Sequence, residues 1–318
     1  MFSPLATEFG VRRLLVAAGQ APSVHNTQPW RFAVSGEEIS LRTDPDRRLR
    51  VSDPRRRSQH VSCGAALFNL RLAVRVTGRR PLVWLLPNPD EEPGLLAAVR
   101  MAGAALASGE QRELYDLIPV RRTSREPFFE RQVPLPVLAE LRIAASREGA
   151  YLRVLDRRGV GETLDYAAKA EDELARDHAY QAELAAWTMS GARFDGVPSH
   201  VHGPRPGKEP GRTRDFGRRA GQARFEEHPL LAVLTTPGDQ PLDWLRAGQA
   251  LQRVLLVATA HGLSASFLNQ PLDLRDMRRR RDPHHRHGHP QMIIRLGYGP
   301  YGARPPRRPA SELETHHA

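Results

Sequence analysis

The feature that most constrains the fold is a segment that occurs twice in the chain. "CGAALFNLRLAVRVTG" (63–78) aligns without a gap with "AGQALQRVLLVATAHG" (247–262), at an offset of 184 residues. The alignment pairs Gly64 with Gly248 and Gly78 with Gly262. Two amphipathic helices that end at glycine can resemble each other by chance. The alternative is an old duplication, which predicts two related α/β halves packed like a dimer within one chain.

Further elements follow from hydrophobic periodicity and from turn residues. Ser3 and Pro4 open a helix that Gly19 ends, and Asp243 is expected to cap a helix over 242–261. "WRFAV…GEEISLRTD" predicts a hairpin with Gly36 in its turn. The other expected strands are "PLVWLLP", as a short buried strand, then "YLRVLD", "PLLAVLTT" and "QMIIRLGYG".

The composition excludes several classes of protein. The chain has 318 residues and a net charge of +11, almost all from arginine, since Lys169 and Lys208 are the only lysines. Such a charge suits nucleic acid, but no helix-turn-helix, RNP motif or zinc-finger spacing occurs, so we expect no nucleic-acid partner. No apolar run is long enough to cross a membrane, and no secretory signal is visible, so a cytoplasmic protein is expected. Cys63, the only cysteine, is expected to be buried and inert.

Two polar segments are the candidates for ligand binding. "GQAPSVHNTQPWRFAV" (19–34) gathers hydroxyls, amides and an imidazole between a helix and a strand. "RRTSREPF" (121–128) surrounds Thr123 with Arg121, Arg122 and Arg125. Guanidinium groups supply both the charge and the donors that a phosphate monoester needs, although the same run can be a solvated surface.

These segments resemble signatures of the nitroreductase superfamily of FMN proteins. "APSVHNTQPW" is similar to its "PSxxNxQPW" motif, "RRTSREPF" to its phosphate-binding "RRSxRxF" segment, and "RLGYG…RPPRRP" to its C-terminal element. In that family the arginine motif comes first, whereas here it follows the "NTQPW" motif. The pattern also resembles the Acg-like proteins of actinobacteria, in which a lid covers the flavin and ordinary nitroreductase activity is doubtful.

The duplication would account for the unusual order. Nitroreductases are intertwined homodimers in which one subunit supplies the arginines and the other the "PSxxN" loop. The resemblance therefore implies an α+β, nitroreductase-like fold of two fused halves, 1–110 and 111–318, that share one FMN. A fused pair has already buried the usual dimer interface, so a monomer is expected. The segment 187–225 is rich in glycine, proline and charge, and we expect it to be either disordered or a lid.

The resemblance also implies roles for particular residues. Ser23 and Asn26 would hydrogen-bond the flavin, Pro22 would shape the loop and Gln28 would support it. The phosphate would be bound by Arg121, Arg122, Thr123 and Arg125, with Arg307 and Arg308 adding charge near the phosphate or the flavin edge. The segment 268–270, with Asn269, would pass the flavin. Trp30 is expected in the core, and the role of His25 stays open.

No metal site is expected. The histidine tract "DPHHRHGHP" (282–290) lacks a completing cysteine or carboxylate and is best interpreted as a solvated loop. Two functions are then expected. The first is an oxidoreductase that takes electrons from NAD(P)H and passes them through FMN to a nitroaromatic, quinone or similar acceptor. The alternative is a flavin-sequestering or stress-related protein whose lid covers the FMN and prevents turnover.

Overall fold

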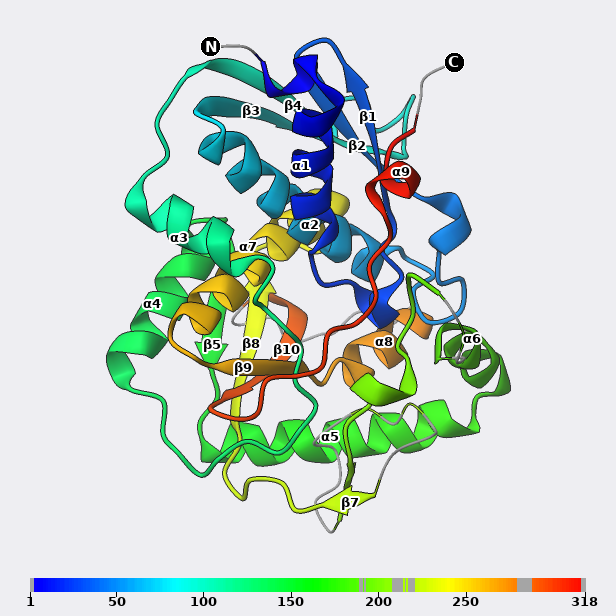
Figure 1. The fold of residues 1–318 in the computed structure, drawn as a ribbon. Helices are drawn as coiled ribbons and strands as arrows, with labels where there is room; N and C mark the ends of the chain where they lie inside the picture. Colours follow the sequence, from blue (N-terminus) through cyan, green and yellow to red (C-terminus); the bar gives the residue numbers. More distant parts are fainter. Residues whose placement is uncertain are drawn as a thin grey trace.

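The first half of the chain forms one antiparallel sheet with helices against it (Figure 1). The computed structural model describes residues 3–188, 191, 193–207, 214, 216, 221–278 and 288–315. The sheet has the strand order β1-β2-β4-β3. The elements of this half are η1 (Pro4–Ala6), α1 (Glu8–Gly19), η2 (Val24–Asn26), β1 (Trp30–Ser35), β2 (Glu38–Thr43), η3 (Pro45–Arg47), α2 (Arg57–Val76), β3 (Arg79–Leu85) and β4 (Leu95–Ala104).

The second half repeats this plan around a second antiparallel sheet, with the order β5-β8-β10-β9. Its elements are α3 (Gly109–Leu117), α4 (Leu135–Ser146), β5 (Tyr151–Val154), α5 (Arg157–Arg176), α6 (His178–Thr188), η4 (Ser199–Val201), β6 (Arg205–Pro206), β7 (Gln222–Ala223), β8 (Leu230–Thr236), α7 (Pro241–Ala260), β9 (Ser264–Phe267), α8 (Gln270–Met277), β10 (His289–Gly297) and α9 (Ala310–Leu313). In each half a helix precedes the first strand, and a long helix, α2 or α7, joins the second strand to the third. Both sheets place their four strands in the order first, second, fourth, third.

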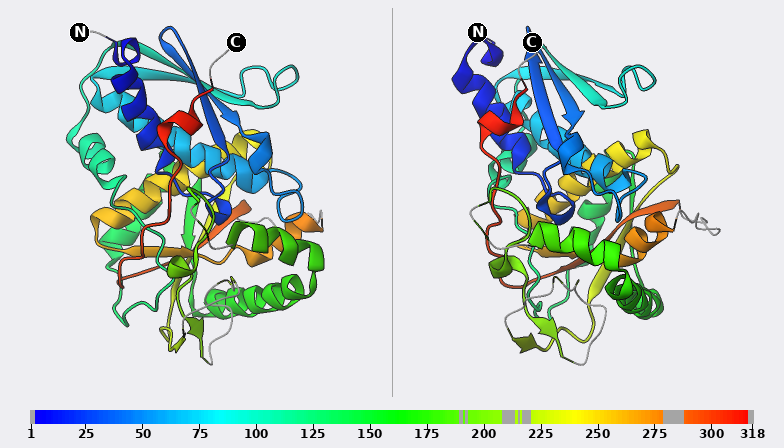
Figure 2. Two further views of the ribbon diagram at one scale, coloured as in Figure 1. Left: turned by 45° about the vertical axis from the view of Figure 1, so that its right-hand side comes forward. Right: turned by 90° about the vertical axis from the view of Figure 1, so that its right-hand side faces the viewer.

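Helices α2 and α7 lie at the centre of the molecule, between the two sheets (Figure 2). They approach each other through the two glycines that the repeat aligns. A Cβ atom added at Gly64 would lie 2.2 Å from the carbonyl oxygen of Leu245, and one added at Gly248 would lie 2.0 Å from that of Val61. Leu245 and Val61 are themselves 184 positions apart, so the contact is reciprocal. This is the pattern of a two-fold symmetric interface.

Two crossing segments tie the halves together. Residues 121–128, which precede α4, run beside β9, where Thr123 forms a bridge with Ala265. The C-terminal segment after β10 crosses back to the first half, where α9 packs near α1 and Glu314 bridges to Phe32 of β1 (Figure 1). Each half therefore contributes chain to the space between them.

Several sequence expectations are corrected by the structure. "PLVWLLP" lies in an edge strand, β3, in which half-buried and exposed side chains alternate, so it is not a buried strand. Gln240, rather than Asp243, is the N-cap of α7, and Asp243 completes a capping box from the third helical position. The helix expected to start at Cys63 begins earlier, at Arg57.

Candidate functional site

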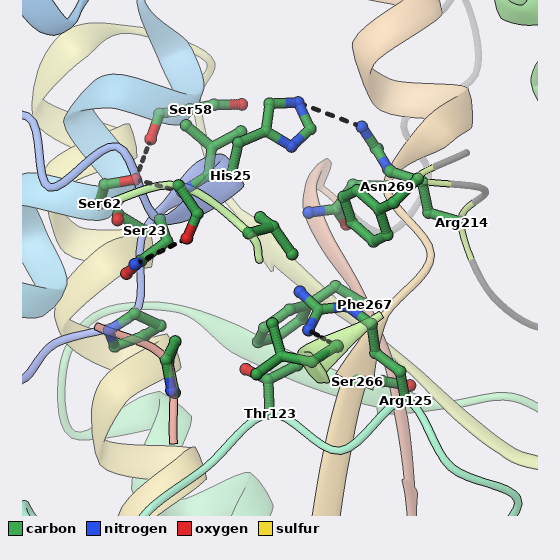
Figure 3. A pocket seen from close by; sticks show the side chains of 18 of the residues that line it. Ser23, His25, Ser58, Ser62, Thr123, Arg125, Arg214, Ser266, Phe267 and Asn269 are labelled. Atoms are coloured by element: carbon green, nitrogen blue, oxygen red, sulfur yellow. Dashed lines mark hydrogen bonds between the residues drawn. The ribbon is translucent and has the colours of Figure 1, made fainter. Parts of the chain in front are cut away.

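A cavity lies between the halves, where the loop before β1, helix α2, the segment around Thr123 and strand β9 converge (Figure 3). Of the eleven residues expected to bind the cofactor, eight line it: Pro22, Ser23, Asn26, Arg121, Thr123, Arg125, Asn269 and Arg307. They come from both halves of the chain. The remaining three, Gln28, Arg122 and Arg308, lie outside the lining.

The loop that carries "SVHNTQ" is held in an unusual backbone conformation. His25, Asn26 and Gln28 all have positive φ angles, of 46°, 54° and 51°. Such angles cost free energy in residues other than glycine and persist only where surrounding contacts fix them. Here the Ser23 hydroxyl accepts a hydrogen bond of 2.9 Å from the backbone N–H of Gln28, and the backbone N–H of Val24 donates to the Ser62 hydroxyl of α2. The strain is typical of a loop shaped for binding.

The Asn26 side chain ties three segments together. Its amide nitrogen donates to the carbonyl oxygens of Gly196 and Pro306, each at 3.0 Å, and its oxygen accepts a 2.7 Å bond from Arg307. Both hydrogens of the Asn26 side-chain amide are therefore used within the protein. Gln28 supports the loop as expected, since it is fully buried and donates to the Phe194 carbonyl at 2.8 Å.

Arg121 is a buried cation that pairs with no carboxylate among the described residues. Its side chain is 4% exposed, and its Nε and Nη1 atoms have no hydrogen-bond partner among the described residues. Burial, and then the charge of Arg122, lower the pKa of Arg121 to about 10. An unpaired buried guanidinium is costly unless an anion completes it. The position of Arg121 in the cavity wall therefore indicates an anion site.

Arg307 lies near Arg121 in the same cavity wall. Burial, followed by the charges of Arg121, Arg122 and Arg304, lowers the pKa of Arg307 to about 9. Its Nη1 reaches Asn26, while its Nε has no partner among the described residues. The mutual repulsion of these arginines shows that the wall has an excess of positive charge.

The remaining arginines have different surroundings. Arg125 donates to the Val201 carbonyl at 2.8 Å and lies over the Phe216 ring. Arg122 is half-buried and donates to the carbonyl oxygen of Arg121. Arg308, expected to add charge near the cofactor, instead donates to the carbonyls of Gln28 and Trp30 at 3.1 and 3.2 Å. Arg308 thus anchors the C-terminal segment to the loop, beside a Trp30 that is fully buried as expected.

The described part of the segment 187–225, here called the lid segment, contributes to the wall of the cavity. Gly196, Val197, Val201, Arg214 and Phe216 all line it. The segment is attached to the binding loop, because Asn26 and Gly196 exchange two hydrogen bonds and Asp195 pairs with Arg47 at 2.6 Å. These contacts favour the lid over the disordered alternative for the described residues.

A buried polar group that sequence reasoning missed completes the wall. Arg214 of the lid segment forms an ion pair with Asp273 of α8 and donates to the Tyr180 hydroxyl at 3.0 Å. Its Nη1 also lies 3.5 Å from Nε2 of His25 (Figure 3). Burial, followed by the charges of Arg214 and Arg125, places the pKa of His25 well below its usual value. His25 is therefore neutral, and it accepts from Arg214.

Strand β9 and the start of α8 supply another part of the wall. Asn269, whose oxygen accepts from Ile293 N at 2.9 Å, lies beside Ser266 and Phe267 (Figure 3). Asn269 follows the repeated helix as the resemblance implied. No sequence pattern pointed to Arg214, Phe216 or Asp273, because their proximity is a product of the tertiary fold alone.

Other expectations concern chemistry outside the cavity. Cys63 is fully buried, which confirms the interpretation as a core residue. Within the described part of the chain no group of histidine, cysteine and acidic residues could hold a metal ion. Residues 284–287 of the histidine tract lie outside the described residues. Among the described helices, none is both long and apolar enough to cross a bilayer.

Comparison with known proteins places the chain in a family. No family model matches it. It is 32% identical over 323 residues to the Mycobacterium tuberculosis protein named "Putative NAD(P)H nitroreductase Rv3131", covering 95% of this chain and 90% of that protein. It is 30% identical over 320 residues to "Putative NAD(P)H nitroreductase acg" of the same organism, covering 95% and 94%. The chain therefore belongs to the nitroreductase family, and within it to the group that includes acg.

Solved structures give weaker matches. The nitroreductase-like family protein from Bacillus cereus has a TM-score of 0.38 and 17% identity, covering 66% of this chain and 96% of that one. The nitroreductase with bound FMN from Bacteroides fragilis has a TM-score of 0.36 and 14% identity, covering 60% and 91%.

Proposed function

We propose that this protein binds FMN in the cavity between its halves and uses NAD(P)H to reduce a nitroaromatic, quinone or similar small acceptor. The observation that carries the proposal is Arg121, a buried cation in the cavity wall with two nitrogen atoms that no described residue satisfies. The FMN phosphate is the anion that the family resemblance implies for this position. The names of the mycobacterial relatives support the choice of NAD(P)H as electron donor.

The other lining residues suit the rest of the cofactor. Arg125 and Thr123 would help Arg121 to hold the phosphate, while Arg307 would place positive charge near the phosphate or the flavin edge. Ser23 and Asn269 would contact the ring or ribityl chain, with Pro22 shaping the loop. Asn26 and Gln28 would act through the loop that they hold together. When bound, FMN would take electrons from the nicotinamide and pass them to the acceptor, and the protein would supply position and electrostatics.

A second function is favoured by the lid segment. Its attachments to Asn26, Arg47 and Asp273 close the cavity from one side. A flavin beneath a firmly closed lid would be sequestered from substrates. In that case the protein would store or shield FMN, and nitroreductase turnover would be absent.

The shared topology of the halves supports a proposal about organisation. We propose that residues 1–110 and 111–318 are a fused pair that buries the interface of an ancestral dimer, so that the chain is a monomer with one complete flavin site. Sedimentation equilibrium tests this directly, and a stable dimer would contradict the monomer.

The decisive experiment is anaerobic spectroscopy of the purified protein. We expect bound or titratable FMN that bleaches on addition of NADPH or NADH and recovers with a nitroaromatic or quinone. Bleaching by dithionite but by neither nicotinamide would support the sequestering function. No FMN binding, even at saturating cofactor, would overturn both functions. An Arg121→Ala variant is the matched control, because its loss of FMN binding assigns the signal to this cavity.

A further inference from the structure

A second pocket occupies the position that the repeat makes equivalent to the first cavity. It lies against the other end of the α2–α7 contact and is lined by residues of α2, β3, α3, α7 and the α4–β5 connection. The offset of 184 maps Ser62, Phe267 and Asn269 of the cavity onto Arg246, Val83 and Leu85 of this pocket. Three of its lining positions are thus the repeat partners of cavity residues.

The pocket has lost the features that would hold a flavin. The loop of ten residues before β1 corresponds here to only four residues, 147–150, between α4 and β5. The lid segment arises between β5 and β8, whereas the equivalent connection between β1 and β2 has two residues, Gly36 and Glu37. Among the described residues, the second pocket therefore has no counterpart of the lid segment and only a short loop in place of the binding loop.

In place of these features it has gained arginine. Six arginines and two glutamates line it, a formal excess of four positive charges. The two glutamates form ion pairs with three of the arginines. Glu148 pairs with Arg71 and Arg253, and Glu110 pairs with Arg253 and Arg147. Within the described residues no ion pair involves Arg75, Arg80 or Arg246.

Apolar side chains accompany these three cations. Leu72, Pro81, Val83, Leu85 and Leu114 line the same pocket. Guanidinium groups bind phosphate oxygens with several donors each, and an apolar wall suits the face of a planar ring. A single phosphate dianion would leave half of the excess charge uncompensated, so the charge count favours a ligand with at least two phosphate groups.

We propose that this pocket is a second ligand site, specific for a small molecule that combines two or more phosphates with a planar aromatic ring, the chemistry of a nucleoside diphosphate. Arg75, Arg80 and Arg246 bind the phosphates, and the apolar wall contacts the base. Because no lid covers the pocket, the ligand exchanges freely with solvent. The site is separate from the flavin cavity and does not depend on the function proposed for it.

The test is calorimetric titration of the full chain with ADP at low ionic strength. We expect binding to the wild type and to Arg121→Ala, and a loss of at least about tenfold in affinity in the triple variant Arg75→Ala/Arg80→Ala/Arg246→Ala. The matched control is the triple variant Arg142→Ala/Arg153→Ala/Arg157→Ala. It removes three exposed arginines that lie outside the pocket, so its net charge equals that of the first triple variant. This control should bind ADP as the wild type does.

Two competitors distinguish the parts of the ligand. Pyrophosphate should displace ADP, and adenosine alone should displace it poorly. Equal loss of binding in both triple variants would show an effect of net charge only and would overturn the proposal, as would undiminished binding in the first variant. If the triple variant does not fold, the single variant Arg246→Ser, which restores the residue found at the equivalent position 62, must weaken ADP binding for the proposal to stand.

Discussion

Gly64 and Gly248 face each other across the contact between α2 and α7, and neither position has room for a methyl group. The added Cβ atoms would lie 2.2 and 2.0 Å from backbone oxygens of the opposite helix, and backbone cannot rotate away as a side chain can. The closest approach of the two halves thus depends on two glycines that the repeat aligns. The consequence is measurable in the stability of the whole molecule.

Substitution of Gly64 or Gly248 by alanine should lower the free energy of unfolding by about 2–3 kcal/mol, because the helices must separate to admit the methyl group. Urea unfolding measures the loss. Gly161→Ala in α5 is the control, since its added Cβ would meet nothing within 4 Å. That variant should gain about 0.5–1 kcal/mol from higher helix propensity. Equal effects in α2 and α5 would contradict the close approach.

Replacement by alanine should affect FMN binding at Arg121 but the stability of the fold at Arg308. Arg121→Ala should weaken FMN binding about 10- to 100-fold while leaving the fold intact, because it removes a charged donor that no described residue uses. Quenching of FMN fluorescence on titration gives the affinity.

Arg308→Ala should instead destabilise the cofactor-free protein by about 2–3 kcal/mol, because the carbonyl oxygens of Gln28 and Trp30 lose a charged donor. Urea unfolding without FMN separates the two effects. A stable Arg308→Ala protein that fails to bind FMN would reverse the assignment and return Arg308 to the cofactor.

Acidification should destabilise the fold through two buried histidines. Burial is the main cause that lowers the pKa of both His25 and His60. The charge of Arg214 adds to the lowering at His25, whereas at His60 the hydrogen bond to the Arg56 carbonyl opposes it in part. Below the unfolded pKa of about 6.5, the unfolded chain binds protons that the folded protein does not, so stability present at neutral pH is lost as the pH falls. The loss should approach about 1.4 kcal/mol per pH unit for each histidine.

The free energy of unfolding, measured in urea at about pH 7.5 and about pH 5.5, tests this dependence of stability on histidine protonation. His25→Gln should reduce the difference between the two free energies, whereas replacement of the exposed His178 should not change it. An unchanged difference in His25→Gln would show that this imidazole is protonated in the folded state.

The Cys63 thiol should be unreactive in the native protein. The side chain is fully buried, and burial raises its pKa far above the usual range. Thiolate is the reactive form, so labelling with a disulfide reagent should be negligible until denaturant is added. Rapid labelling of the native protein would require an opening between α2 and β1.

Much of the fold was predictable from the sequence, because it rests on local patterns. The repeated helices, the hairpin at Gly36 and the strands around "PLLAVLTT" all follow from periodicity and from turn residues. The errors arose where exposure depends on tertiary position. β3 has an apolar sequence, yet it lies at a sheet edge with every second side chain exposed.

The site was predictable only in part. The motifs around Ser23 and Arg121 could be found because each is contiguous. The group formed by His25, Arg214 and Asp273 could not, since its members come from three distant segments and meet only in the folded chain. Sequence reasoning also could not tell that Arg308 serves the C-terminal segment, while Arg307, its neighbour, lines the cavity.

The presence of both sheets in one polypeptide changes what a mutation can do. In a homodimer every substitution appears in both subunits, so the two sites always change together. A residue at the symmetry axis must also pack against its own copy. In this chain Ser62 and Arg246 occupy equivalent positions and differ. Selection can therefore act on each half separately, and a protein built in this way can acquire a new role in one half while the other half keeps its original role.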